Sequence, residues 1–147
     1  MKNINKQAPV ICTQSITINA SSKSVWEVLT GIDRWPGWQT DIDKAKLNGP
    51  LQSGTSFHWK TGGARIHSTL HTVEPDNQLG WTGKTFGLFA IHNWRLTELE
   101  GKTRVEVEES MEGLLAKLFK KPFNKNLEKG MKKWLELLKQ ESEQGAN

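Results

Sequence analysis

The chain has 147 residues, a length that fits one domain with a sizeable core. No stretch approaches the run of about 18 consecutive apolar residues that a membrane-spanning helix needs. The first residues lack the apolar run of a secretory signal, so we expect a cytoplasmic protein without integral membrane contact. The formal net charge is +4, and the segment from Lys117 to Lys139 carries eight lysines against two glutamates.

That basic segment is most simply a solvated helix face, with anionic lipid or nucleic acid as alternatives. We expect no nucleic-acid partner. The single cysteine, Cys12, cannot form an internal disulfide and is interpreted as a small buried hydrophobe rather than a reactive thiol. The chain also has seven tryptophans and no tyrosine. Their large rings can fill a core, or they can wall a pocket that is not completely filled.

The first predicted elements are a strand over residues 10–19 and a short helix. Apolar residues alternate with polar ones along the strand. Ser21 or Ser22 fits the N-cap of the helix, and the apolar stripe over residues 25–29 faces the core. Gly31 follows directly and is expected to end the helix.

The segment GIDRWPGWQTDI cannot form a long helix, because Pro36 and Gly37 interrupt it. One or two short turns are predicted there, carrying Trp35 and Trp38. These two rings have two interpretations, a movable lid over a pocket or ordinary packing.

Six further strands are predicted, joined by short connections. Gly62-Gly63 and the Pro-Asp-Asn sequence at residues 75–77 are typical of hairpin turns, and Glu100-Gly101 marks another. Successive strands with short connections favour an antiparallel meander. The predicted strands cover residues 43–47, 55–60, 65–73, 79–84, 88–96 and 103–111.

The C-terminal part, from residue 114 to about residue 143, has helical periodicity. Its apolar residues recur at spacings of three and four, which predicts a long amphipathic helix interrupted near Pro122. The apolar face of such a helix needs a large apolar partner, and the concave face of the sheet offers one. The predicted fold class is therefore α+β, a curved seven-stranded antiparallel sheet wrapped around a long C-terminal helix. Two short helices lie between strands 1 and 2, and we expect a cavity at one end.

The hairpin centred on Glu100-Gly101 places His92 opposite Glu109. On the second strand Val105, Val107 and Met111 share one face and, being apolar, must face the interior. His92 and Glu109 share that face. Directly opposite residues place their Cβ atoms about 4.5–5.5 Å apart, so this imidazole and this carboxylate can form a hydrogen bond. The same parity argument around Gly62-Gly63 turns His58 and Lys60 to the outer face.

Three interpretations of the pair of His92 and Glu109 remain open. The two groups can satisfy each other and tighten the sheet, because a buried carboxylate needs a partner. They can anchor a hydroxyl or carbonyl group of a ligand. They can also perform acid–base chemistry, since histidine changes charge near neutral pH. No nucleophile or oxyanion device is visible beside them.

No metal ion or cofactor is expected. His67 and His71 are four residues apart on one strand, hence about 13 Å apart at 3.3 Å per residue, and cannot share an ion. His92 and Glu109 alone supply too few ligands for a closed zinc site.

Five stretches together resemble a known superfamily: ITINASSKSVWEVLTGIDRWPGWQ, GPLQSGTSFHWKTGG, VEPDNQLGWTG, AIHNWRL and EESMEGLLAKLF. The chain is similar to bacterial members of the START-like, polyketide cyclase/dehydrase (SRPBCC) superfamily. The resemblance covers nearly the whole chain and implies one domain over residues 1–147 with the helix-grip fold of the major birch-pollen allergen. It implies a deep pocket between helix and sheet for an apolar or aromatic small molecule. It provides no universal catalytic residue, because members include lipid carriers, cyclases and hydrolases.

The leading hypothesis is a carrier, sensor or sequestering protein for a hydrophobic or aromatic small molecule, acting as a monomer or homodimer. The alternative is a polyketide cyclase/dehydratase- or hydrolase-type enzyme in which His92 moves a proton and Glu109 orients it. A third hypothesis is a partner-binding module that uses the basic helix face. The candidate ligand-binding residues are Trp38, Phe57, Trp59, Ile66, Ser68, Leu70, Trp81, Phe86, His92, Trp94, Glu109, Met111, Leu115, Phe119 and Phe123.

Overall fold

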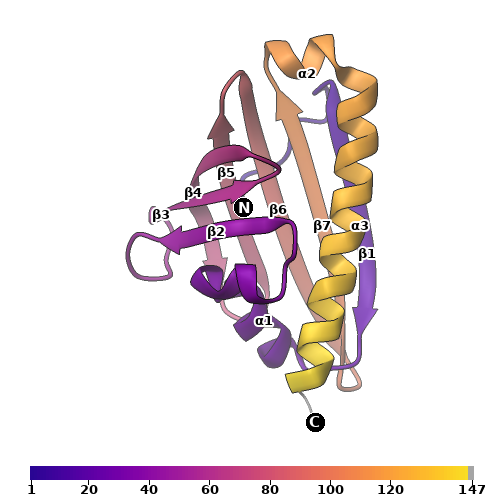
Figure 1. The fold of residues 1–147 in the computed structure, drawn as a ribbon. Helices are drawn as coiled ribbons and strands as arrows, with labels where there is room; N and C mark the ends of the chain where they lie inside the picture. Colours follow the sequence, from indigo (N-terminus) through magenta and orange to yellow (C-terminus); the bar gives the residue numbers. More distant parts are fainter. Residues whose placement is uncertain (146–147) are drawn as a thin grey trace.

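A seven-stranded antiparallel sheet curves around one long helix in the computed structural model, which describes residues 1–145 (Figure 1). The strand order is β1-β7-β6-β5-β4-β3-β2, which follows the chain except for β1 at the edge. This architecture confirms the predicted α+β helix-grip fold. The strands are β1 (Val10–Ile18), β2 (Ile42–Leu47), β3 (Ser56–Thr61), β4 (Ala64–Glu74), β5 (Gln78–Thr85), β6 (Leu88–Leu99) and β7 (Lys102–Glu112).

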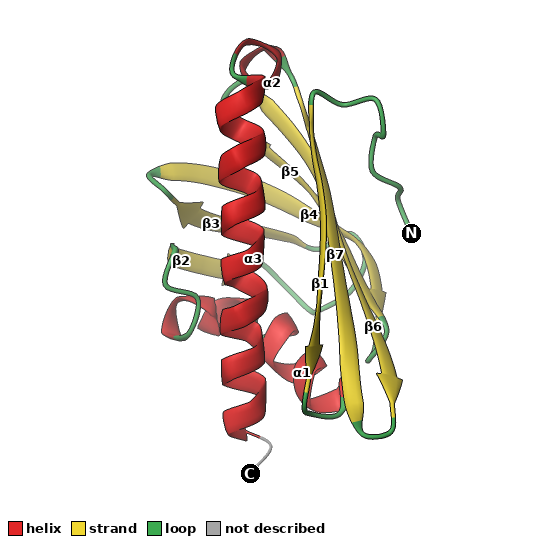
Figure 2. Cartoon of the chain, turned by 90° about the vertical axis from the view of Figure 1, so that its right-hand side faces the viewer, coloured by secondary structure: helices red, strands yellow, loops and turns green. Residues whose placement is uncertain are grey.

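The two short helices predicted between the first two strands are α1 (Ser22–Thr30) and the 3-10 helix η1 (Ile32–Gly37). Ser21 is the N-cap of α1, and its hydroxyl oxygen accepts a hydrogen bond from the amide of Ser24 at 3.2 Å. Near the C-terminus come α2 (Leu114–Leu118) and the long α3 (Lys120–Gly145). Figure 2 shows β2 and β3 on one side of α3 and β1 and β7 on the other, so the sheet surrounds the helix.

The helical tail is interrupted one turn before the predicted position near Pro122. The break lies at Phe119, whose φ of −117° and ψ of 39° leave the helical region. Pro122 itself lies in the first turn of α3, where a proline is tolerated. Because its nitrogen carries no hydrogen, it cannot bond the carbonyl of Leu118 four residues earlier, and its ring would clash with that carbonyl in a continuous helix, which favours the break at Phe119.

The hairpin turns have the geometry that their sequences predict. Glu100 and Gly101 have φ values of 54° and 78°, so both central residues are left-handed as in a type I′ turn. The resulting register pairs His92 with Glu109 across β6 and β7, as predicted. In β4 the register shifts between Leu70 and Thr72, so a bulge separates the two halves of that strand.

One end of the interior is filled by large side chains centred on Trp35, which is 0 % exposed. Its indole Nε1 donates a hydrogen bond to the carbonyl of Leu29 at 2.9 Å. Its ring meets those of Phe57 and Trp134 edge-on, with centroids 5.6 and 5.3 Å away. Of the two interpretations of Trp35, the structure supports packing. We call this region the packed end; it comprises Val25, Leu29, Ile32, Trp35, Phe57, Leu79 and Leu138.

The N-terminal residues lie across the outer face of the sheet, where His71 is half-buried. The side-chain amide of Asn93 donates to the carbonyl of Lys2 at 2.7 Å, and the amide of Asn5 donates to the hydroxyl of Ser110 at 3.0 Å. Burial lowers the pKa of His71, and the N-terminal ammonium and Lys2 lower it further, whereas the side chain of Asn93 opposes them.

Candidate ligand-binding cavity

A cavity of about 330 Å³ lies between the concave face of the sheet and the first half of α3. Its rim includes exposed side chains such as Lys84 and Asn126, whereas Trp81 and His92 at its floor are buried. The cavity therefore opens to solvent and leads inward to an aromatic floor. Other residues in its wall are Ile42, Trp59, Ile66, Leu88, Met111, Phe123, Leu127, Met131 and Trp134.

Small side chains explain why this part of the interior is hollow. The strand register aligns Ser68, Gly83 and Ala90 across β4, β5 and β6 in one row of the concave face. The helix contributes Gly130 to the same cavity, and a Cβ atom added there would meet nothing within 4 Å. Gly130 borders open space, whereas a Cβ atom at Gly83 would lie 3.1 Å from Oγ of Ser68. The small residues of this row and the helical glycine therefore add little side-chain volume to this part of the interior.

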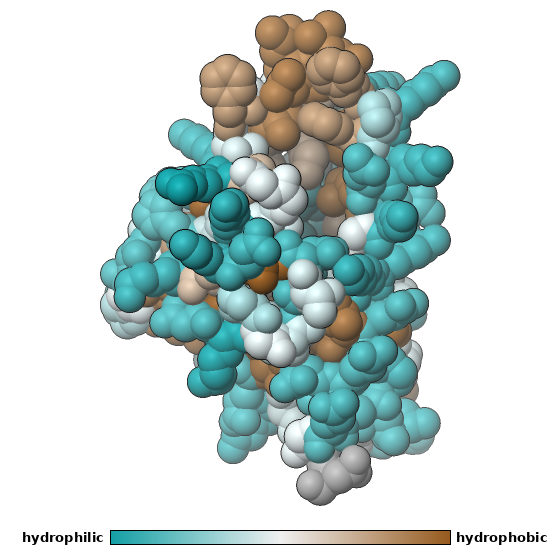
Figure 3. All heavy atoms as spheres, viewed as in Figure 1, coloured by the Kyte–Doolittle hydropathy of each residue, from teal (hydrophilic) through white to brown (hydrophobic). Residues whose placement is uncertain are grey.

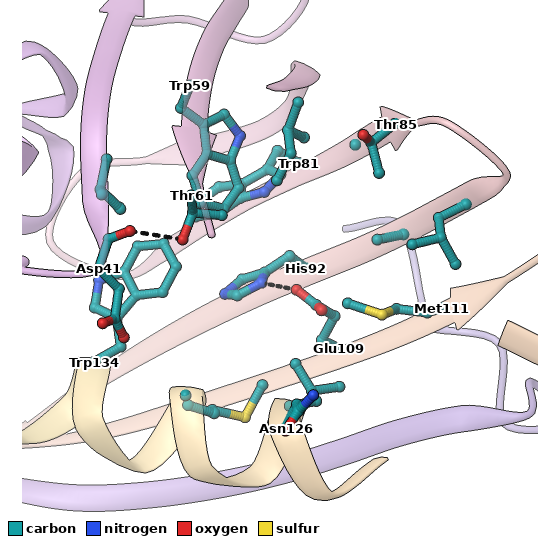
Figure 4. A pocket seen from close by; sticks show the side chains of 18 of the residues that line it. Asp41, Trp59, Thr61, Trp81, Thr85, His92, Glu109, Met111, Asn126 and Trp134 are labelled. Carbon is teal, nitrogen blue, oxygen red and sulfur yellow. Dashed lines mark hydrogen bonds and ion pairs between the residues drawn. The ribbon is translucent and has the colours of Figure 1, made fainter. Parts of the chain in front are cut away.

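The next row of the sheet carries the polar pair. His92 Nδ1 is hydrogen-bonded to Glu109 Oε1, and the side chains are only 5 % and 9 % exposed (Figure 4). The imidazole also stacks on Trp81, with ring centroids 4.5 Å apart and planes 8° from parallel. The ring of His92 is thus fixed by a hydrogen bond at its edge and by an indole on its face.

The second ring nitrogen of this histidine is buried at the floor of the cavity. Nε2 of His92 is buried and has no hydrogen-bond partner among the described residues. Figure 4 shows it on the side of the imidazole away from Glu109, and the ring of Trp134 lies 5.5 Å from the imidazole between centroids. A buried polar atom without a partner costs about 1–3 kcal/mol, so this nitrogen needs a polar group from a ligand or a water molecule.

Further polar contacts hold the rim in place. Thr61 Oγ1 donates to the carbonyl of Asp41 at 2.8 Å (Figure 4). The ammonium of Lys133 on α3 lies 2.7 Å from Oδ1 of Asp41, and the amide of Asp41 donates to Oε1 of Gln39 at 2.8 Å. These contacts fasten the segment before β2 to both β3 and α3, so this side of the cavity has a defined wall.

The described residues 1–145 contain no group of three or more His, Cys, Asp or Glu side chains placed to hold a metal ion. Cys12 is half-buried beneath α3, and burial is the main cause that raises the pKa of its thiol. A raised pKa keeps the sulfur protonated and poorly nucleophilic. Within the same range, no helix is both long and apolar enough to cross a bilayer.

Seven of the residues that the sequence singled out for ligand binding line this cavity. They are Trp59, Ile66, Trp81, His92, Glu109, Met111 and Phe123. Phe57, Ser68, Leu70 and Trp94 are buried in the sheet beside or beneath it and do not line it. Trp38 lies apart, in a separate groove between α1, η1 and the end of α3, and is partly buried against the core.

Phe86, Leu115 and Phe119 do not line the cavity. Phe86 is 90 % exposed and Phe119 49 % exposed, at the turn between β5 and β6 and at the break between the helices. Gly87, with φ of 72°, turns the chain sharply after Phe86, and Leu115 packs against that glycine. These local turns, rather than helical or strand periodicity, determine where the three side chains lie.

Several lining residues were not singled out from the sequence. Gly83 and Ala90 share the face of Trp81 and His92 by strand parity, so the signal for them was present. Gly130 has no side chain, so hydrophobic periodicity does not identify it. A glycine within the apolar stripe of a helix nevertheless indicates that space is left there. The remaining helical members lie on the predicted apolar stripe or beside it: Asn126, Leu127, Met131 and Trp134.

The comparisons with known proteins agree with this geometry. A model of the family described as polyketide cyclase/dehydrase and lipid transport matches residues 9–143. A search of curated proteins gave no match. Among solved structures, a hypothetical protein of Helicobacter pylori is similar with a TM-score of 0.84 and 20 % identity, covering 97 % of each chain.

Two further solved structures are similar over most of the chain. The Zhui aromatase/cyclase of Streptomyces sp. R1128 has a TM-score of 0.82 at 13 % identity, covering 93 % of this chain and 95 % of that one. A START superfamily protein of Mycobacterium smegmatis has a TM-score of 0.75 at 12 % identity, with 91 % and 97 % covered. At these identities the likeness shows a shared fold.

Proposed function

The chain belongs to the polyketide cyclase/dehydrase and lipid transport family, and from that membership we propose that its cavity binds a small aromatic molecule bearing a hydroxyl or carbonyl oxygen. The observation that carries this proposal is the buried, unpartnered Nε2 of His92 inside a wall of aromatic side chains. The flat apolar body of the ligand lies against Trp59 and Trp81. Its oxygen takes the position next to His92. The protein then acts as a carrier, sensor or sequestering protein.

The size of the cavity restricts the ligand. About 330 Å³ is near the lower end of the range of about 300–1,000 Å³ that ligand pockets span. One compact molecule of a few fused rings suits this space, whereas a lipid with two acyl chains would have to leave most of its length outside. We therefore propose an aromatic ligand in preference to a membrane lipid.

A hydroxyl group suits His92 in either protonation state. When Nδ1 donates to Glu109 and the ring is neutral, Nε2 accepts a hydrogen bond from a hydroxyl. When the ring is charged, Nε2 donates to the same oxygen. A carbonyl oxygen can only accept a hydrogen bond, so it pairs only with the charged form of the ring. The pair thus favours ligands with a hydroxyl group.

The test compares two probes that differ by one hydroxyl group, 2-naphthol and naphthalene, using quenching of tryptophan fluorescence. We expect 2-naphthol to bind about tenfold more tightly, because one hydrogen bond contributes about 1–1.5 kcal/mol. His92→Phe should abolish the difference and leave naphthalene binding, while His67→Gln on the outer face should change neither. Equal affinity of both probes for the unaltered protein, or no binding of either, would contradict the proposal.

The orientation of His92 also supports a second candidate function, an enzyme of the cyclase/dehydratase type. An imidazole at the floor of a cavity, whose Nδ1 is fixed by a carboxylate and whose Nε2 has no partner, is arranged as a general acid or base. In a dehydration, Nε2 would give its proton to the leaving hydroxyl group, which departs as water, and take back the proton lost from the neighbouring carbon.

The two functions differ in what the protein releases. Unaltered protein and His92→Phe protein, purified from the same cells and denatured, would release their bound compounds for mass measurement. A binding protein releases the same compound from both, in smaller amount from the variant. An enzyme releases compounds that differ by one water, because the variant retains unreacted substrate.

A further inference from the structure

Four large apolar side chains are exposed together at one end of the molecule, and we call them the apolar tip: Phe86, Leu114, Leu118 and Phe119. They are 90, 67, 65 and 49 % exposed. Figure 3 shows apolar side chains covering the upper end, over α2 and the turn between β5 and β6, with hydrophilic side chains beside them. A contiguous apolar surface of this kind on a monomer marks an interaction site.

The tip has a defined shape. The turn that carries Phe86 is fixed by Gly87, where an added Cβ would lie 2.9 Å from Cγ of Leu115 on α2. Gly113, which begins α2, approaches so closely that its Cβ would lie 2.4 Å from the carbonyl oxygen of Gly87. The turn and the helix are therefore packed backbone to backbone, and their apolar side chains project outward as a fixed group.

Positive charge surrounds these side chains. The two segments that build the tip, residues 84–89 and 112–125, contain five lysines and a single acidic residue, Glu112. This excess equals the formal net charge of +4 of the whole chain, so the other 15 basic and 15 acidic residues cancel. The lysines are exposed and have flexible stems; they are Lys84, Lys117, Lys120, Lys121 and Lys125.

We propose that the apolar tip docks this protein on membranes that contain anionic lipid. Apolar side chains that project from one end of the molecule can enter the boundary between head groups and acyl chains, whereas a helical peptide would need a groove. The surrounding lysines complement anionic head groups, each contributing about 1 kcal/mol near such a surface. The contact is peripheral, because no described helix could span the bilayer.

Docking would bring the cavity to the membrane. The ring of Phe119 in the tip lies 6.2 Å from that of Phe123, which lines the cavity. Leu88, two residues after Phe86, lines it as well. An apolar molecule could thus pass between bilayer and cavity along a continuous apolar surface. The docking itself does not depend on which molecule the cavity binds.

The experiment is co-sedimentation with vesicles of phosphatidylcholine alone or with 30 mol% phosphatidylserine, at about 0.05 and 0.5 M salt. We expect binding to the anionic vesicles that weakens at high salt. Lys117→Gln with Lys121→Gln should weaken it about thirtyfold at about 1 kcal/mol per lysine. Phe86→Ser with Leu118→Ser should weaken it more than tenfold, since both side chains leave the acyl region.

A matched control lies at the opposite end of the molecule, in the turn between β6 and β7 (Figure 1). Leu99 there is 74 % exposed and Lys102 is exposed. Leu99→Ser with Lys102→Gln should leave vesicle binding unchanged, and circular dichroism should show all variants folded. Absence of binding, equal binding to neutral vesicles, or equal loss in the control would overturn the proposal. Analytical ultracentrifugation would show whether the apolar tip instead joins two copies of the chain, and such a dimer would also overturn the proposal.

Discussion

The packed end and the cavity lie on the same concave face, yet one is full and the other hollow. At the packed end, Trp35 is completely buried and its only polar atom has a partner at 2.9 Å. In the cavity, open space lies beside Gly130, and a buried nitrogen of His92 lacks a partner. The two regions share one sheet and one helix. The contrast therefore comes from the sizes of the side chains and from whether buried polar atoms have hydrogen-bond partners.

That contrast separates stability from function within one core. A region that maximises packing fills its volume and pairs its polar atoms, because voids and unpaired groups cost free energy. A region that leaves both a void and an unpaired nitrogen is less stable than it could be. Features of this kind concentrate at binding sites. The predictions below test whether the two regions differ in this way.

The largest expected effect is at the packed end. Trp35→Ala should lower the free energy of unfolding by about 4 kcal/mol, because it creates a cavity at the centre of an aromatic cluster. Trp59→Ala, in the wall of the existing cavity and already partly exposed, should cost less than half as much. Urea unfolding of both variants measures the difference. Equal losses would mean that the two regions contribute equally to stability.

The polar pair should show the next largest effect. Glu109→Leu leaves Nδ1 of His92 buried without its partner and should cost about 2 kcal/mol. Adding His92→Phe should restore most of that stability, since an apolar pair of similar shape has no unmet hydrogen bond. A double-mutant cycle in urea checks this. If the double variant is less stable than either single variant, the pair is there to stabilise the sheet.

A smaller effect of opposite sign is expected at Gly130. Gly130→Ala should raise the free energy of unfolding by about 1 kcal/mol, because alanine favours the helix and its Cβ meets nothing within 4 Å. The matched glycine is Gly80 on the outer face, where a Cβ would lie 2.3 Å from Cε1 of His71. Gly80→Ala should therefore destabilise the protein. Thermal unfolding of both distinguishes open space from close packing.

The smallest effect lies outside both regions, at His71. Its pKa is lowered in the folded protein from the ordinary 6.5, chiefly by burial, so the unfolded chain binds the proton more readily. Stability from this group is complete above pH 6.5 and is lost as the pH falls through that value toward the lowered pKa. Urea midpoints at pH 7.5 and 5.5 should differ less in His71→Gln than in the unaltered protein. His58→Gln, exposed on the same face, should leave the difference unchanged.

Strand parity predicted much of the site from the sequence. The turn at Glu100-Gly101 determined the register, and the register brought His92 opposite Glu109 on the concave face. This argument succeeds because each strand residue points to one of two faces, and one apolar neighbour is enough to identify the inner face. The fold followed from the same patterns together with the long apolar stripe of the last helix.

Empty space and local turns were harder to predict. Gly83 and Gly130 line the cavity without a side chain, so a search for ligand-binding side chains passes over them. Phe86 and Phe119 lie at a turn and at a helix break, where periodicity does not determine direction. Both had been expected at the cavity, and both lie in the apolar tip.

Native mass spectrometry of the protein purified from cells tests the central claim most directly, when combined with two variants at Gly130. The unaltered protein and Gly130→Ala should each carry a small aromatic compound at near one-to-one ratio that is released on denaturation. Gly130→Phe, whose ring fills the cavity from the helix, should be folded and carry no bound compound. If all three proteins are bare and show no thermal shift with 2-naphthol, the cavity does not bind such a ligand and the account is wrong.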